Sequence, residues 1–237
     1  MKTSPPARRA RWRWLRYTRA MIGSHHGSTG HEHHFSLAIL LGAIDYLEAR
    51  SILEIGAGTG NAMAYLKARR PALRVLGIEP AREFREAAYA KGIDSQDLVS
   101  GDALDLQFET GSIDIVYAVA VLHHIQDHHQ AVSEMLRVAA KAVFISDSNN
   151  FGQGGFLMRS VKQLLNAGGL WKLADWAKTR GKGYTITEGD GLVYSYSAFN
   201  DYPLLRSRCR SVHVLNTTAA GINPYRTAPD VALLGIK

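Results

Sequence analysis

The feature that most constrains the fold is an alternation of short apolar runs with helix-periodic segments between residues 51 and 147. The apolar runs have the length of strands and end at turn-forming residues, whereas the segments between them repeat apolar side chains at helical spacing. Strands that alternate with helices form right-handed βαβ units, in which helices cover both faces of a mostly parallel sheet. The predicted strands are 51–55, 74–78, 97–100, 113–119 and 142–147, and the predicted helices are 61–69, 81–91 and 127–138.

The flanking segments extend this α/β arrangement. Residues 35–49 repeat leucine and isoleucine at helical spacing and predict a helix, while 23–34, rich in Gly, Ser and His, is typical of a loop. After residue 147 the alternation becomes irregular. The pattern there predicts helices at 156–166 and 170–178, a polar glycine-rich loop at 179–190, and strands at 192–199, 213–216 and 231–236.

The basic character of the chain is confined to its N-terminal segment. The formal net charge is +7, and residues 1–19 contain seven Lys and Arg residues but no Asp or Glu, which leaves 21 basic against 21 acidic residues in the remainder. Enzymes that act on nucleic acid usually carry a basic stripe across the folded body. We therefore expect no nucleic-acid partner, whereas the basic segment 1–19 suits peripheral contact with an anionic membrane surface.

The remaining composition is typical of a cytoplasmic protein. Cys209 is the single cysteine, which excludes a disulfide framework and a thiolate metal site. No apolar run approaches the roughly 20 residues of a membrane span. Arg8 and Arg9 resemble a twin-arginine signal, but further arginines interrupt the region where its apolar stretch would follow.

A glycine-rich turn follows the first predicted strand. Gly56, Gly58 and Gly60 allow a sharp bend and a close ligand approach, and the next helix directs free N–H groups at a ligand carboxylate. A dinucleotide fingerprint would need Gly-x-Gly-x-x-Gly, and here the third glycine comes one residue early. Glu54 would also repel a pyrophosphate but could bind an ammonium group, so the turn argues against NAD.

The later predicted strands also end in polar residues, where ligands bind in open α/β sheets. Glu79, followed by Pro80, could accept hydrogen bonds from both hydroxyls of a ribose. Asp102 could accept a bond from an adenine amino group, and the N–H of Ala103 could meet a ring nitrogen. The fourth such strand runs out into the segment 117–125.

Four motifs in this order resemble the class I S-adenosylmethionine (SAM) dependent methyltransferases, in particular their small type 11 branch. They are Glu-x-Gly-x-Gly-x-Gly at 54–60, Glu-Pro at 79–80, Gly-Asp-Ala at 101–103 and Leu-His-His-Ile at 122–125. The resemblance covers about residues 50–147. It implies a Rossmann-like sheet of seven strands whose last two strands form an antiparallel hairpin. It also implies a basic tail and lid at 1–35 and a methyltransferase domain at 36–237 with an acceptor-facing insertion at about 148–200.

The resemblance further implies SAM as the cofactor and a role for each matched residue. The methionine part would lie near Glu54, Gly56, Gly58 and Gly60, and Ala118 and Val119 would line the same side. The ribose would lie at Glu79 and Pro80. The adenine would lie at Asp102 and Ala103.

Methyl transfer needs a general base only when the acceptor must lose a proton early, as many hydroxyls must. The best candidate bases are His123 and His124, because they follow the strand whose end borders the methyl group and because imidazole titrates near neutral pH. Histidines 31, 33 and 34 could face His123 if the N-terminal segment folds over the cofactor. No metal site is predicted, because loop histidines are more often solvated and no further ligand set is evident.

These residues lead to a hypothesis of methyl transfer from SAM to a small molecule, at oxygen. A methyltransferase acting on RNA or protein is one alternative, although the fourth strand ends in 117–120 without the Asn/Asp-Pro-Pro-Tyr motif of amino-methylating nucleic-acid enzymes. A SAM-binding protein that does not methylate is another. The aromatic residues of the insertion, which include Tyr194 and Tyr196, fit core packing better than acceptor binding.

Overall fold

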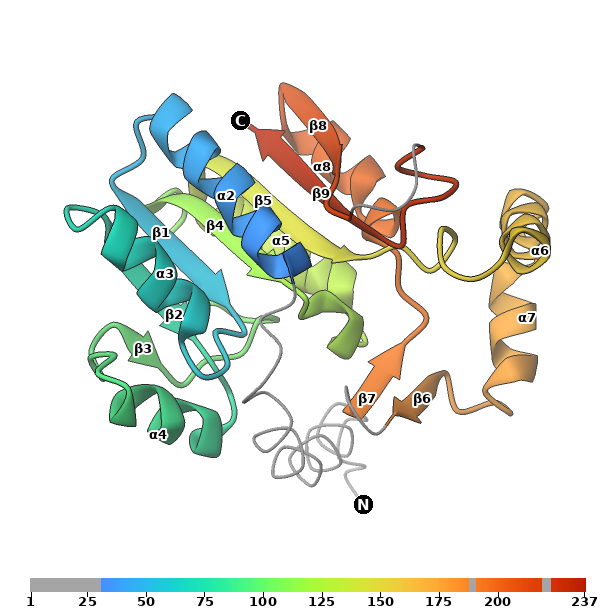
Figure 1. Ribbon diagram of the computed structural model, residues 1–237, viewed down its shortest axis with the longest axis horizontal. Helices are drawn as coiled ribbons and strands as arrows, with labels where there is room; N and C mark the ends of the chain where they lie inside the picture. Colours follow the sequence, from blue (N-terminus) through green and yellow to red (C-terminus); the bar gives the residue numbers. More distant parts are fainter. Residues whose placement is uncertain (1–30, 188–190, 219–222) are drawn as a thin grey trace, which may run out of the picture.

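A computed structural model describes residues 31–187, 191–218 and 223–237 of the chain (Figure 1). The basic segment 1–19 and the proposed membrane contact through it lie outside the described residues. So does most of the predicted lid.

A sheet of seven strands forms the centre of the molecule, in the order β3-β2-β1-β4-β5-β9-β8. Strands β1 to β5 are parallel, and β9 runs antiparallel to both β5 and β8. This confirms the predicted mostly parallel sheet and its C-terminal hairpin. The strands are β1 Ser51–Ile55, β2 Arg74–Ile78, β3 Leu98–Val99, β4 Ile113–Val119, β5 Ala139–Ser148, β8 Ser211–Asn216 and β9 Asp230–Ile236.

Helices cover both faces of the sheet (Figure 1). Strand side chains alternate between the two faces, so Ile52 of β1 packs with α2 and α3, whereas Leu53 packs with α5 and α8. Strand β4 is almost entirely buried, as expected for a strand covered on both sides. The helices of this domain are α2 His31–Tyr46, α3 Asn61–Arg69, α4 Arg82–Ala90, α5 His128–Val138 and α8 Tyr202–Arg208, and 3-10 turns occur at η1 Leu122–His124 and η2 Ala198–Asn200.

The N-terminal helix begins earlier than predicted. Helix α2 starts at His31, so the expectation of a loop through residue 34 is wrong for 31–34. The glycines and serines that indicate a loop end at Gly30, and nothing in 31–34 prevents the helix from continuing toward its N-terminus. The Ser36 hydroxyl of α2 lies 2.7 Å from that of Ser146 in β5, so the extension that carries His33 lies next to the C-terminal edge of the sheet.

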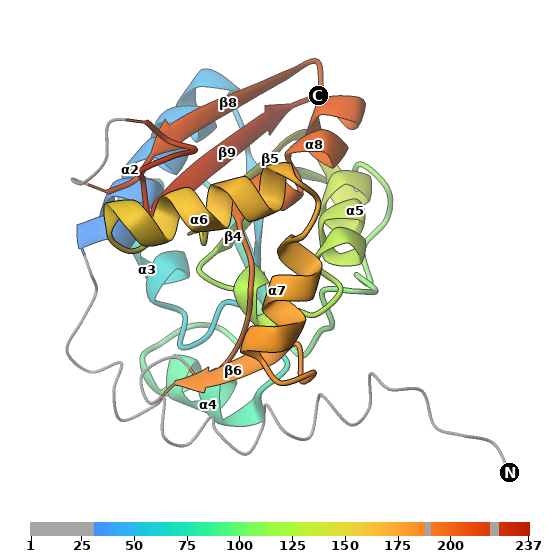
Figure 2. The same ribbon diagram turned by 90° about the vertical axis from the view of Figure 1, so that its right-hand side faces the viewer.

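The segment after β5 differs most from the sequence prediction. Helices α6 Phe156–Ala167 and α7 Trp171–Lys178 lie to one side of the sheet and lead into a separate hairpin of β6 Tyr184–Thr187 and β7 Gly191–Tyr194 (Figures 1 and 2). The predicted strand 192–199 ends at Tyr194. Its continuation fails because Ser197 turns its hydroxyl to the backbone of Phe199 and begins η2.

Asn149 joins this segment to the sheet. It follows β5 and is buried, its Oδ1 accepts a hydrogen bond from the Ser197 hydroxyl at 2.9 Å, and its Nδ2 donates to the turn that precedes β9. The acceptors are the carbonyl oxygens of Pro224 at 3.0 Å, Tyr225 at 2.9 Å and Ala228 at 3.0 Å.

We expect Asn149→Ala to lower the free energy of unfolding by about 2–3 kcal/mol, because it leaves buried carbonyl groups without a donor. Urea denaturation measures this change. Asn166→Ala is the control, because Asn166 makes one longer bond, 3.2 Å to the Tyr225 hydroxyl, near the surface. A loss for Asn149→Ala as small as that of the control would show that this side chain does not hold the segment.

Candidate active site

The glycine turn after β1 is packed at one end and open in its middle. Gly56, Gly58 and Gly60 have φ angles of 68°, 53° and 73°, in the left-handed region that favours glycine. A Cβ atom at Gly56 would collide with the side chain of Val121, whereas one at Gly58 would have no atom within 4 Å. The turn therefore rests against the chain that leaves β4 and presents open space at Gly58.

Glu79 holds this turn from the neighbouring strand. It follows β2, is buried, and accepts hydrogen bonds from the N–H of Gly58 at 3.0 Å and of Ala81 at 2.8 Å. Burial raises the pKa of Glu79 to about 7, against the opposing effect of these backbone donors. Each carboxylate oxygen keeps a further lone pair, so the predicted bonds to ribose hydroxyls are compatible with the turn-holding role.

Glu54 is the second buried carboxylate at this edge. It is 5% exposed, and within the described part of the chain its Oε2 has no hydrogen-bond partner. Burial raises the pKa of Glu54 to about 8; the nearby Tyr117 hydroxyl acts to lower it, and the charge of Glu79 acts to raise it. A buried carboxylate oxygen without a partner fits a cationic ligand group such as an ammonium.

The other predicted cofactor residues lie on adjacent strand ends, because β3, β2, β1 and β4 are neighbours in the sheet. Asp102 is exposed after β3, and its Oδ1 accepts a hydrogen bond from the Leu104 N–H at 3.0 Å. Ala103 and Pro80 are half-buried. Ala118 is buried near the end of β4, and Val119, the last residue of that strand, is half-buried.

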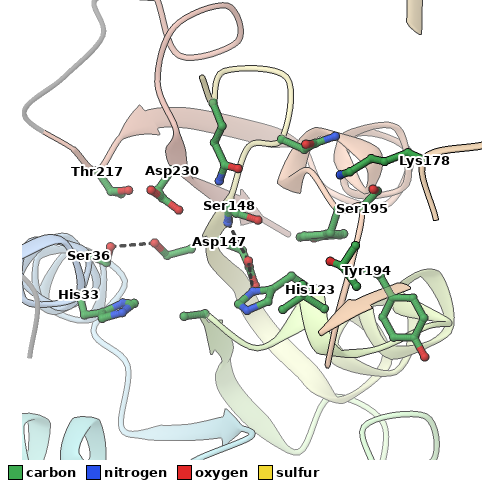
Figure 3. Close-up of a pocket in the computed structure, with 17 residues that line it drawn as sticks. His33, Ser36, His123, Asp147, Ser148, Lys178, Tyr194, Ser195, Thr217 and Asp230 are labelled. Atoms are coloured by element: carbon green, nitrogen blue, oxygen red, sulfur yellow. Dashed lines mark hydrogen bonds and ion pairs between the residues drawn. The ribbon is translucent and has the colours of Figure 1, made fainter. Parts of the chain in front are cut away.

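A pocket of about 360 Å³ lies at the C-terminal ends of β4 and β5 (Figure 3), and Ala120 in its lining directly precedes Val121, the residue against which Gly56 packs. Helix α2, the ends of β8 and β9, α7 and the β6–β7 hairpin also contribute to it. Most of the lining is polar and includes His33, His123, Asp147, Lys178 and Asp230.

Ala120 lies where the glycine turn and the pocket meet. It lines the pocket with a φ of 53°, an angle that costs free energy for any residue except glycine. Its N–H donates to the carbonyl of Ser146 at 2.8 Å, which fixes the point where the chain turns from β4 into η1. The next residues bring His123 into the pocket.

Asp147 orients His123. The Asp147 carboxylate is fully buried near the end of β5, and its Oδ1 lies 2.6 Å from His123 Nδ1 (Figure 3). The same carboxylate accepts N–H bonds from Val121 at 3.0 Å, Leu122 at 2.8 Å and Ser148 at 2.7 Å. These bonds fix the position of the carboxylate and of the turn that carries the histidine.

The protonation of this pair follows from its surroundings. Burial alone would raise the pKa of Asp147, but the charge that His123 carries when protonated, its hydrogen bond and the backbone N–H groups together lower it below its usual value. A carboxylate that stays ionised requires a donor on Nδ1 of the facing ring. The hydrogen on Nδ1 therefore makes Nε2 the ring atom that can take up a proton.

The two candidate histidines differ in position. His123 lines the pocket, whereas His124 Nδ1 bonds to the backbone carbonyl of Leu192 at 2.7 Å and holds β7 against η1. Of these two histidines, His123 is the one that lines the pocket.

The histidines of α2 also separate. His33 lines the pocket, and its ring is turned toward that of His123 in Figure 3, as predicted for a covering segment. His34 instead stacks on Tyr65 of α3, with ring centroids 5.8 Å apart. Nothing is described of the side chain of His31.

Sequence reasoning did not identify Asp147 as a site residue. Asp147 is the last residue of a predicted strand, and Glu79 and Asp102 directly follow predicted strands. The criterion of a polar residue at a strand end would therefore have identified Asp147 too. Asp230 and Thr217 line the pocket from the C-terminal hairpin, and no local signal marks them. Tyr194 and Tyr196 also line the pocket, so an acceptor-facing position exists in addition to their packing.

Among the described residues, one group offers three metal-type ligands: His128, His129 and Asp201. The Asp201 carboxylate is buried, and both imidazoles bond to it through Nδ1 at 2.8 to 3.0 Å. Tyr196 donates a further bond at 2.9 Å. These contacts form a hydrogen-bond network that joins α5 to α8, so His128 is held by Asp201 and does not simply face solvent.

Part of the chain is similar to known methyltransferases. A family model described as a methyltransferase domain matches residues 53–145. Ajmaline N-methyltransferase of Rauvolfia serpentina is 31% identical over 101 residues, which are 40% of this chain and 34% of that protein. The probable tocopherol O-methyltransferase of Oryza sativa subsp. japonica is 35% identical over 96 residues, or 38% and 26% of the two chains. The match thus spans about a third of the length of the first of these relatives and about a quarter of the second.

A solved methyltransferase structure shares the fold. The solved structure of an S-adenosylmethionine dependent methyltransferase from Mesorhizobium loti superimposes with a TM-score of 0.53 at 14% identity, covering 79% of this chain and 90% of that one. Residues 53–145 thus match a methyltransferase domain, and the shared fold agrees with the resemblance seen in the sequence. SAM is the cofactor of this class, and the open space at Gly58 and the buried Glu54 oxygen fit its methionine part.

We expect Asp102→Ala to weaken SAM binding roughly tenfold, because it removes a hydrogen-bond acceptor beside the predicted adenine position. Asp102 is exposed, so the substitution should leave the fold intact. Isothermal calorimetry measures the dissociation constant. Asp105→Ala, on the same turn, is the control. Equal affinities for the wild type and both variants would remove Asp102 from the cofactor site.

The raised pKa of Glu54 predicts a pH-dependent stability. The folded state holds a proton on Glu54 more tightly than the unfolded state, so its contribution is complete below about pH 4.5 and is lost as pH rises toward 8. Without cofactor, Glu54→Gln should therefore flatten the decline in stability between about pH 5 and pH 8. Urea denaturation across this range measures it, with the exposed Glu86→Gln as control. Parallel curves for wild type and Glu54→Gln would contradict the raised pKa.

Proposed function

We propose that this chain transfers the methyl group of SAM to a hydroxyl oxygen of a small molecule, with His123 as general base and Asp147 as the residue that positions it. The observation that carries this proposal is the 2.6 Å contact between His123 Nδ1 and Asp147 Oδ1 in the wall of a polar pocket beside the glycine turn. A base is useful for hydroxyl acceptors, because they must lose a proton.

The pocket favours a small acceptor with polar groups. A volume of about 360 Å³ is at the lower end of the range for small-molecule sites. Ser146, Tyr194 and Asp230 line it and can exchange hydrogen bonds with an acceptor, and Lys178 at the end of α7 can pair with an anionic group. The curated relatives include N- and O-methyltransferases by name, so the choice of oxygen rests on the histidine and not on them.

When bound, SAM supplies an activated methyl group on a sulfonium whose leaving group is a neutral thioether. The protein has to hold the acceptor oxygen in line with that methyl group and to receive the hydroxyl proton. His123 Nε2 takes the proton while Nδ1–H remains directed at Asp147. The Asp147 carboxylate stabilises the resulting imidazolium and keeps the ring in one orientation.

RNA or protein substrates fit these features less well. The positive charge excess lies in residues 1–19 and not in the rest of the chain, which has equal numbers of acidic and basic residues. A pocket of this size also admits a small molecule or a single side chain, not a folded surface.

We expect His123→Ala to lower kcat by roughly 10²- to 10⁴-fold with little change in SAM affinity, because the variant lacks the base. Asp147→Asn should lower kcat too, and it should move the acidic limb of the pH–rate profile to lower pH, because the imidazolium loses its anionic partner. Formation of S-adenosylhomocysteine with a panel of phenols, alcohols, carboxylic acids and amines measures turnover.

His213→Ala is the matched control, since His213 is exposed on β8 and does not line the pocket. Unchanged kcat for His123→Ala would exclude it as the base. SAM binding without methylation of any panel member would favour the alternative of a SAM-binding protein that does not methylate.

A further inference from the structure

Helix α6 faces solvent with its apolar side. Leu157, Val161 and Leu164 recur at helical spacing and form one stripe, which normally packs against a core. Here Leu157 is 76% exposed and Leu164 is 73% exposed, and no residue of the helix is buried.

The polar side of α6 makes the attachment to the body. Lys162 Nζ donates to the carbonyl of Asn150 at 2.8 Å, and Gln163 Nε2 donates to the carbonyls of Phe151 at 3.0 Å and Arg226 at 2.9 Å. The orientation is therefore the reverse of that of an ordinary surface helix, and several hydrogen bonds hold it in place.

Helix α7 continues the exposed apolar surface. Trp176 is 63% exposed, and no residue of this helix is buried either. Both helices stand at the edge of the molecule that Figure 2 views directly. We call this surface the α6–α7 face; its exposed apolar residues are Phe156, Leu157, Met158, Val161, Leu164, Leu170, Leu173 and Trp176.

The same segment is strongly basic. Residues 156–183 contain six Lys and Arg residues and one acidic residue, Asp175, which accepts a hydrogen bond from Ser195. Lys172, Lys178, Arg180 and Lys182 are exposed. An exposed apolar face with cations around it is the composition of helices that lie in the interface of an anionic bilayer.

We propose that the α6–α7 face docks on an anionic lipid bilayer, with its apolar side chains below the headgroups and its lysines and arginines at the phosphates. Two other occupants fit the charge less well. A second copy of the chain would bring two basic faces together, and their like charges would repel. The N-terminal segment 1–19 would also be repelled, because it carries seven Lys and Arg residues and no Asp or Glu. Within the described residues no helix is long and apolar enough to cross a bilayer.

The segments that flank helices α6 and α7 also line the pocket. Asn150 and Gln153, just before α6, line the pocket, as does Lys178 at the end of α7. Docking through the α6–α7 face would therefore hold the pocket close to the lipid surface. The docking proposal itself does not depend on methyl transfer.

Flotation of the full chain with vesicles tests the proposal. Vesicles of equal parts phosphatidylglycerol and phosphatidylcholine should carry the wild type with them, and vesicles of phosphatidylcholine alone should bind it much less. The triple variant Leu157→Ser, Val161→Ser, Leu164→Ser should weaken binding to the anionic vesicles roughly tenfold or more. Lys172→Glu with Lys182→Glu should weaken it as well, and added salt should have the same effect.

Tyr46→Ser is the matched control, because Tyr46 is exposed on α2, away from this face. A second readout separates the face from the N-terminal segment. In a chain with Trp12→Phe and Trp14→Phe, the remaining tryptophans are both in α7, and brominated lipids in anionic vesicles should quench their fluorescence.

Wild-type flotation that the triple variant leaves unchanged, or absence of quenching from α7, would overturn the proposal. So would a dimer in analytical ultracentrifugation that the triple variant dissociates and that does not bind vesicles.

Discussion

The candidate active site depends on the hydrogen bonds that the buried carboxylate of Asp147 accepts. This carboxylate lies near the end of β5 and accepts hydrogen bonds from the backbone that leaves β4 and from the ring of His123. A charge in the interior is stable only when such donors surround it. The same contact therefore sets the path of the chain between the two strands and the orientation of the imidazole. The glycine turn depends on the same connection between β4 and η1, because Gly56 packs directly against Val121.

Two further carboxylates, Glu54 and Glu79, occupy the neighbouring strand ends, and their environments differ. The Glu79 carboxylate accepts hydrogen bonds from the backbone N–H groups of the glycine turn and of the chain after β2. It therefore holds the turn in place. Among the described residues, one oxygen of Glu54 has no hydrogen-bond partner, and burial raises the pKa of Glu54 further than that of Glu79. Such a group favours either a proton or a bound cation, and a cofactor with an ammonium group would supply the cation.

The helices after β5 are attached to the molecule differently from the helices that cover the sheet. They are held by hydrogen bonds from Lys162 and Gln163, and their apolar side chains face outward. The polar pocket and the apolar α6–α7 face meet in this region, so one segment provides both acceptor-facing groups and the proposed lipid contact. A stable protein tolerates this exposure when a partner covers the apolar surface.

The sequence by itself determined most of the parallel sheet and the glycine turn that follows its first strand. Strands 51–55, 74–78 and 113–119 were predicted with the bounds that the structure has, because a buried parallel strand is a continuous apolar run and its glycine turn needs φ angles that favour glycine. The tertiary structure alone distinguished His123 from His124, since the distinction depends on Asp147 from another strand. It also decided that α6 turns its apolar side outward, because helical spacing defines two faces and only the contacts of the folded chain determine which one is covered.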